Sequence, residues 1–150
     1  MKRLTLLLLL CCCCYACQDR RCLYHQYRYI AHESWQQQDS LSFDIQVEPQ
    51  LLARYEEGLP ISYNLRIDQS QTAAYPYRNL MVAVMTQCDN SVHIDTLDLR
   101  PHDRKKENPS CLAPFVFSAD RFPFRVVVYH LMQDEQLPHL QRLGLELTIP

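Results

Sequence analysis

The sequence predicts an all-β protein, a β-sandwich of about seven to eight strands with at most one short helix. Two observations favour this fold class. Apolar and polar residues alternate with a period of two in several short segments. These segments follow one another at intervals of about 10 to 20 residues, the spacing expected of a sandwich. The strand arrangement is expected to be that of a jelly roll or an immunoglobulin-like domain.

One expected strand covers residues 41–47, where apolar residues at the odd positions alternate with polar ones. Residues 80–86 are nearly all apolar, which is typical of a central strand. In residues 92–99 the alternation changes phase near Thr96, which predicts a β-bulge. The other expected strands cover residues 61–67, 115–117, 124–132 and 143–149.

The apolar faces of these strands are expected to form a core between two sheets. That expected core contains Phe43, Ile45, Tyr63, Leu65, Leu80, Val82, Val84, Phe117, Val126, Val128 and Leu145.

A single segment, residues 49–57, has the features of a helix. Pro49 suits a first helical turn and Gly58 ends the segment, so either a short helix or a turn of 3₁₀ helix is expected there. With two glycines in the chain, the turns between strands must rest mainly on Pro, Asn, Asp and Ser.

The N-terminus has the order of parts found in a lipoprotein signal peptide. Lys2 and Arg3 precede an apolar run over residues 4–14, and Ala16 stands directly before Cys17. The run is shorter than the roughly 20 helical residues that span a bilayer, so a cleaved signal is favoured over an uncleaved anchor helix. We therefore expect a signal peptide over residues 1–16 and a diacylated Cys17, with Cys13 as a weaker rival.

The expected organisation is a lipidated cysteine and tether over residues 17–28, followed by a sandwich domain over residues 29–150. Each methylene buried in a membrane contributes about 0.8 kcal/mol, so two or three acyl chains hold such a domain to the membrane durably. The membrane is either the inner or the outer one, and the domain faces the periplasm or the cell surface.

The chain has eight cysteines, of which Cys11 to Cys14 leave with the signal and Cys17 takes the lipid. Cys22, Cys88 and Cys111 remain, without the C-x-x-C spacing of zinc or redox sites. Cys88 and Cys111 are expected either as a disulfide, which an oxidising periplasm permits, or as two buried thiols.

Charge and motifs argue against several function classes. The net charge is −2, and losing Lys2 and Arg3 makes the mature chain more acidic, so nucleic-acid binding has no electrostatic support. No Gly-x-Ser-x-Gly, His-Glu-x-x-His or glycine-rich phosphate loop is present. His93 and Asp95 share a strand face, but no third metal ligand is suggested. We expect that the protein is not an enzyme and that it has neither a metal site nor a small-molecule cofactor.

Aromatic residues are dense near the start of the chain, at Tyr24, Tyr27, Tyr29 and Trp35. Such side chains stack on sugars or anchor protein partners when exposed, and fill a core when buried. An aromatic strip on one sheet face would favour sugar binding, and aromatics between the sheets would favour a scaffold.

A second aromatic segment runs from Tyr75 to Leu80. Tyr75 and Tyr77 share a face and are not expected both to enter the core, so at least one of Tyr75, Tyr77 and Arg78 is expected on the surface as part of a partner-binding patch. Pro76 keeps Tyr75 extended, and Asn79 suits the turn before the buried Leu80.

Several short motifs occur in an order that resembles the GldH family of gliding-motility lipoproteins of the Bacteroidetes. After the lipoprotein cysteine, the matching residues are Trp35, Asp39 and Phe43, then 63–67, then Tyr75-Pro76-Tyr77-Arg78-Asn79-Leu80, then Asp95-Thr96-Leu97, and finally 129–138 and 143–145. The order is followed along nearly the whole mature chain, which is more specific than any one motif.

The resemblance implies a lipid-anchored, non-enzymatic accessory component of the gliding machinery, or of the type IX secretion apparatus associated with it, with protein partners in the envelope. The family's glycine-rich stretch with a tryptophan is replaced here by residues 98–106, so the chain resembles a divergent member. The rival hypothesis is a surface glycan-binding lipoprotein in which Trp35 and the tyrosines form the sugar platform.

Overall fold

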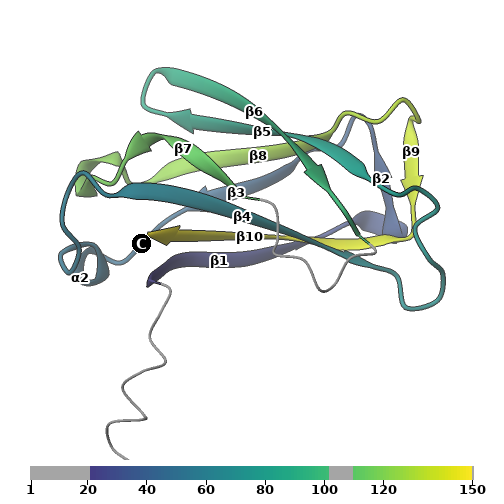
Figure 1. Ribbon diagram of the computed structural model, residues 1–150, viewed down its shortest axis with the longest axis horizontal. Helices are drawn as coiled ribbons and strands as arrows, with labels where there is room; N and C mark the ends of the chain where they lie inside the picture. The colour runs from purple at the N-terminus through teal and green to yellow at the C-terminus, as the bar shows by residue number, and fades with distance from the viewer. Residues whose placement is uncertain (1–20, 102–109, 150) are drawn as a thin grey trace, which may run out of the picture.

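The computed structural model describes residues 21–101 and 110–149, which form two four-stranded sheets packed face to face and a small two-stranded sheet at one end (Figure 1). The strands are β1 (Arg21–Tyr29), β2 (Ser34–Gln36), β3 (Leu41–Ile45), β4 (Pro60–Gln69), β5 (Leu80–Cys88), β6 (Ser91–Leu99), β7 (Ser110–Val116), β8 (Phe124–His130), β9 (Gln136–Pro138) and β10 (Leu140–Ile149). The helical elements are η1 (Ala31–Glu33), α2 (Pro49–Leu52) and η2 (Ala119–Arg121). The expected signal peptide, Cys17 and most of the 98–109 loop lie outside the described residues.

The all-β sandwich expected from the sequence is therefore confirmed. One sheet has the order β1-β10-β4-β7, the other has the order β3-β8-β5-β6, and all neighbouring strands are antiparallel. With β2 and β9 left aside, the chain crosses from one sheet to the other at every step except β5 to β6, as in two Greek keys, which makes this a jelly roll rather than an immunoglobulin-like sandwich. The first and last strands of the domain are hydrogen-bonded neighbours in one sheet.

The expected tether over residues 17–28 is too long, because residues 21–29 form β1, an edge strand of the first sheet. Its pairing with β10 shifts register between Cys22 and Tyr24, and this irregularity turns the side chain of Leu23 into the core, where it is 5% exposed. A bulge interrupts the period of two, so the sequence of this segment lacks the regular alternation that predicts a strand. Residues 21–29 therefore belong to the sandwich and not to the tether.

β6 is more regular than the sequence predicted. It pairs with β5 from Ser91 to Leu99 without a register shift, so the bulge predicted near Thr96 is absent from this pairing. The phase changes because β6 carries apolar residues on both faces: Leu99 is buried, whereas Val92 and Ile94 on the outer face are 61% and 52% exposed.

The core lies between the two sheets, and all eleven residues expected there are buried. The three inward leucines of β10, Leu143, Leu145 and Leu147, are fully buried, and so are Leu65 on β4 and Val128 on β8. This alternation of inward apolar and outward polar residues is the reason that the strands form where the sequence predicts them.

The small sheet and some strand limits were not expected. β2 and β9 have three residues each, too few to show a period, and β10 begins three residues before the expected 143. The expected strand at 115–117 is the end of the longer β7, where Pro114 hid the pattern. The expected helix at 49–57 is confined to the four residues of α2.

The two ends of the sandwich are different, and we name them by their position along the first strand. At the proximal end β1 begins, β10 ends, α2 links β3 to β4, and η2 links β7 to β8. At the distal end lie β2, β9 and the loop between β4 and β5 (Figure 1). Gly58 closes the α2 connection at a φ of 87°, which glycine adopts without strain, and its N–H donates to the carbonyl of Phe117 at 2.8 Å.

Removing a core side chain tests the packing. Leu65→Ala is expected to lower the free energy of unfolding by about 2–5 kcal/mol, because Leu65 is fully buried and the two sheets cannot close over the cavity. Leu112→Ala, on a residue that is 64% exposed, should change the free energy of unfolding by no more than about 0.5 kcal/mol. Urea denaturation of both variants measures the difference, and equal effects would contradict the assigned core.

His130 makes stability depend on pH. It is 2% exposed, and this burial lowers its pKa from the ordinary 6.5, against the smaller opposing effect of the Trp35 backbone. The unfolded chain therefore takes up a proton at a higher pH than the folded one, and stability falls as the pH drops below about 6.5, by at most about 1.4 kcal/mol per pH unit. In His130→Leu this part of the pH dependence should vanish, and in His25→Gln, on an exposed histidine, it should remain; thermal melts at pH 7.5 and 5.5 measure both.

Candidate functional site at the distal end

The loop from Tyr75 to Asn79 is held by its first residue. The backbone N–H of Tyr75 donates to Oε1 of Gln69 at 3.0 Å, and its hydroxyl donates to the carbonyl of Asn79 at 3.3 Å. The Tyr75 side chain is 1% exposed, and this burial raises its pKa. Tyr75 is therefore a structural residue, and the expectation that it helps to bind a partner is wrong for its side chain.

The remainder of the segment is closer to solvent. The ring of Tyr77 meets the ring of Tyr75 edge to face, with 5.3 Å between centroids, and is half-buried against the core. Both tyrosines thus pack inward, in contrast to the expectation, because the turn lets the second ring lie on the first rather than beside it. Pro76, Arg78 and Asn79 are exposed, and Leu80 is fully buried at the start of β5.

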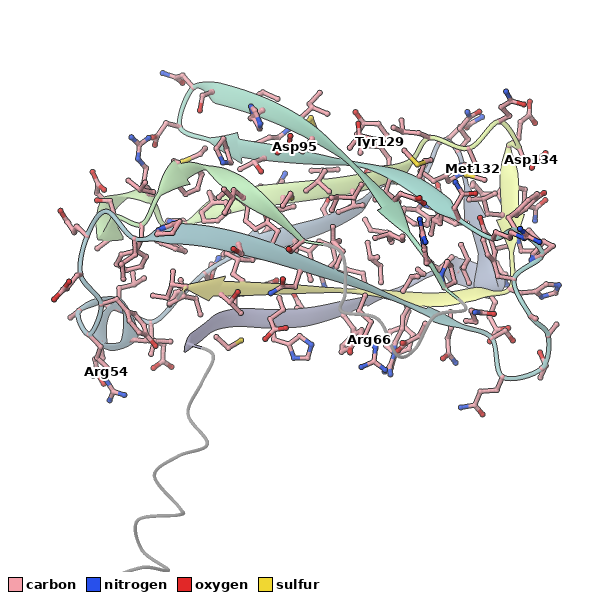
Figure 2. All side chains as sticks on the ribbon, viewed as in Figure 1. Arg54, Arg66, Asp95, Tyr129, Met132 and Asp134 are labelled. Carbon is pink, nitrogen blue, oxygen red and sulfur yellow. The ribbon has the colours of Figure 1, made fainter. Side chains whose placement is uncertain are left out.

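A second segment of the distal end lies against this loop. The hydroxyl of Tyr77 is hydrogen-bonded to Asp134, which raises the pKa of Tyr77. The N–H of Leu131 donates to the carbonyl of Met81 at 2.8 Å, and the N–H of Met81 lies 3.5 Å from Sδ of Met132. Met132 and Asp134 project from the turn that leads into β9 (Figure 2).

These two segments form one surface, which we call the distal patch: Pro76, Tyr77, Arg78, Leu131, Met132 and Asp134. Four of its residues are exposed and two are half-buried, and Leu131 is an exposed large apolar residue at 46%. The patch combines an aromatic ring, aliphatic side chains, a cation and a carboxylate in one place. This combination suits the binding of a protein surface.

Trp35 is buried at the distal end and does not reach the surface. It is 1% exposed, its Nε1 donates to the carbonyl of Asp39 at 3.0 Å, and its ring lies edge to face with that of His130 at 5.6 Å. Trp35 is also paired with Leu137 in the small sheet. The sugar platform that was to include Trp35 is therefore not formed by this residue.

Asp95 and Thr96 are not part of the distal end. They lie in the middle of β6, where Asp95 is half-buried and Thr96 faces outward. Oδ2 of Asp95 lies 3.2 Å from Nε2 of His93 on the same face of the strand. Across the described residues no group of three His, Cys, Asp or Glu side chains is placed to hold a metal ion.

The comparisons with known proteins do not bear on the resemblance to the GldH family. No protein-family model matches the chain, and no curated protein matches it. The motifs at Trp35 and Asp39, at 75–80 and at 129–138 are separated in sequence, yet the structure brings them together at one end of the sandwich.

A second aromatic surface, missed in the sequence, lies on the outer face of the first sheet. The ring of Tyr27 rests on Gly144, where a Cβ would come within 2.6 Å of it, and the guanidinium of Arg142 lies 4.3 Å from the ring centroid. Arg142 is fixed by Asp68 at 2.6 Å, and Tyr29 beside it is 72% exposed. The signal in the sequence was Gly144 within an alternating strand, since a glycine there makes room for a ring.

Cys88 and Cys111 are free thiols in the structure, the alternative to the disulfide. Burial, and then the nearby carboxylate of Asp95, raise the pKa of Cys111 to about 11. Burial likewise raises the pKa of Cys88, so both thiols stay protonated and unreactive at neutral pH.

Proposed function

We propose that this protein is a lipid-anchored, non-enzymatic accessory component of the gliding-motility or type IX secretion-associated machinery in the cell envelope, and that it binds an envelope protein through the distal patch. The observation that carries the proposal is that three of the separate motifs on which the resemblance rests meet at the end opposite to the start of β1. That end is the one an anchored domain turns away from its membrane.

The geometry of the anchor supports this orientation. Cys17 precedes Arg21 by four residues, which span at most about 14 Å of extended chain. The ten residues of β10 span about 33 Å at the usual rise per residue, from the distal end to the proximal end. A lipid on Cys17 therefore holds the proximal end near the membrane and leaves the distal patch free. No helix in the described ranges is both long and apolar enough to span a bilayer.

The chemistry of the patch fits a protein partner. Binding energy at protein interfaces is concentrated in a few aromatic and arginine side chains surrounded by apolar contacts. Tyr77 is held in place by Tyr75 and Asp134, so it loses little conformational entropy on binding. Arg78 and Leu131 are exposed in the same two segments and supply charge and apolar area.

A second candidate function, glycan binding, is favoured by one observation. Tyr27 and Tyr29 lie on the outer sheet face together with Arg142 and Asp68, and a sugar can stack on an aromatic ring while polar groups bind its hydroxyls. However, Tyr27 is already covered by Arg142 on one side and by Gly144 on the other, which leaves Tyr29 as the exposed ring.

Lipid anchoring is tested by Cys17→Ala. The variant is expected to accumulate as unprocessed precursor, and the protein should move from the detergent phase to the aqueous phase on phase partitioning, because the acyl chains are the attachment. Cys22→Ala serves as the control, since Cys22 lies within β1, and should be processed and retained normally. Normal processing of Cys17→Ala would refute the assignment, and Cys13 would be tested next.

Partner binding is tested by an Arg78→Ala, Leu131→Ala double variant. Tyr77 is left intact because its half-buried ring contributes to folding. Loss of about 2 kcal/mol of binding energy, roughly thirtyfold in affinity, should remove the partner from pull-downs of solubilised envelopes, while the melting temperature stays near that of the wild type.

Two further variants serve as comparisons in the same pull-down. Arg54→Ala, on an exposed arginine of the proximal end, should recover the partner at the wild-type level (Figure 2). Tyr29→Ala should also recover it. An undiminished yield from the double variant would count against the distal patch, and loss of polysaccharide retention in Tyr29→Ala alone would favour the glycan-binding function.

A further inference from the structure

An apolar cleft opens at the proximal end. Its volume is about 490 Å³, within the range of small-molecule sites. One wall comes from the segment after β3 and from α2, and the other comes from η2 and the residues before β8. The side chains that matter here are Val47, Leu52 and Ala53 on the first wall, and Ala119, Phe122 and Pro123 on the second.

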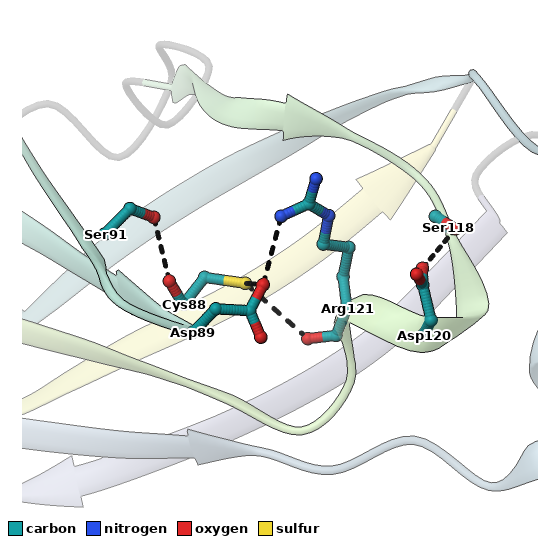
Figure 3. Close-up of polar contacts among 6 residues, drawn as sticks. All are labelled: Cys88, Asp89, Ser91, Ser118, Asp120 and Arg121. Carbon is teal, nitrogen blue, oxygen red and sulfur yellow. Dashed lines mark hydrogen bonds and ion pairs between the residues drawn. The ribbon is translucent and has the colours of Figure 1, made fainter.

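Both walls are held in place by contacts outside the cleft. Nη1 of Arg121 in η2 lies 3.1 Å from Oδ2 of Asp89 in the β5–β6 turn, and the carbonyl of Arg121 accepts from the thiol of Cys88 at 3.8 Å (Figure 3). Ser118 and Asp120 are hydrogen-bonded to each other at the start of η2. On the other wall, the ring of Tyr55, after α2, packs on Phe117 at 6.0 Å. The cleft is therefore a built feature of the fold.

The lining selects for an apolar ligand. Gln46 is its polar member, and the remaining lining side chains are aliphatic, aromatic or proline. A ligand in this cleft would gain by leaving water and would find few hydrogen-bond partners.

The rim is acidic. The two segments that form the walls, and the residues directly after α2, contain the exposed carboxylates of Glu48, Glu56, Glu57 and Asp120. The exposed cations there are Arg54 and Arg121, and Arg121 is paired with Asp89, as the neighbouring Arg125 is with Asp44. An anionic headgroup or a free fatty-acid carboxylate would be repelled at the mouth of the cleft. The ligand that fits is a hydrocarbon chain with a headgroup of no net charge.

The position of the cleft indicates the source of such a hydrocarbon chain. The cleft lies at the end where β1 begins, and β3, which leads into its first wall, packs across from β1. With at most about 14 Å of chain between Cys17 and Arg21, a lipid anchor brings the mouth of the cleft close to the membrane surface.

We propose that the cleft takes up a fatty acyl chain of a net-neutral phospholipid from the leaflet that holds the Cys17 anchor. This inference rests on the lipid anchor of the proposed function and gives the anchored domain a second contact with the membrane. The contact fixes the orientation of the domain, which a flexible lipid anchor alone does not.

The test uses the full-length lipidated protein in phosphatidylcholine vesicles that contain a phosphatidylcholine with a photoreactive diazirine in one acyl chain. After illumination, adducts are expected in peptides covering residues 46–53 and 119–123. An Ala53→Asp, Ala119→Asp double variant should reduce these adducts about tenfold or more, because it places two charges in an apolar cleft. Both alanines are exposed at the mouth, so the fold is expected to be kept, and circular dichroism checks this.

The matched control is Ala74→Asp, the same change on an exposed alanine of the distal end, which should leave the labelling unchanged. Vesicle-bound protein with no adducts in the cleft, or with equal labelling of the double variant, would overturn the inference. Labelling of the cleft by a diazirine in the protein's own Cys17 lipid, but not by one in phosphatidylcholine, would also overturn it. Wild-type protein that fails to float with the vesicles would instead refute the lipid anchor, and this inference with it.

Discussion

The rest of the structure depends on β10 more than on any other strand. It lies between β1 and β4, and the inward leucines that it supplies are fully buried. Without it, the first sheet would split into a single strand on one side and a strand pair on the other, and the core would lose Leu143, Leu145 and Leu147. Because β1 is the outer neighbour of β10, the same insertion also fixes the end of the sandwich at which the N-terminal segment leaves the domain.

That position separates the molecule into two ends with different chemistry. The proximal end has the apolar cleft with its acidic rim, and the distal end has a patch in which Tyr77 and Arg78 lie beside Leu131. The strands between them are paired over their length and their inner faces are closed by the core, so they act as a rigid spacer. A membrane contact at one end and a partner contact at the other can then be made together, because neither requires the domain to change shape.

The sequence predicted the fold well where burial imposes a strict period, as at Phe43, Leu65 and Leu145. It was wrong where another feature disturbs that period. The irregular pairing at Cys22 interrupts the alternation in β1, so this strand was not predicted. In the regular strand β6, the outward Val92 and Ile94 changed the phase of the pattern and led to the prediction of a bulge. At the candidate site it identified the segment from Tyr75 to Leu80 but could not assign its side chains, since that depends on how the turn folds back. The segment beside it, at 131–134, was brought there by tertiary contacts with Met81 and Tyr77, for which no local pattern exists.

The pairing of Arg21 with Ile149 has a consequence for folding. β1 pairs with β10, which lies far from it in the sequence, so the edges of β1 and β4 stay open until β10 is in place. Contacts between residues this far apart form slowly, and open strand edges are prone to pair with other chains in the meantime. The topology thus makes completion of the first sheet a late step in folding.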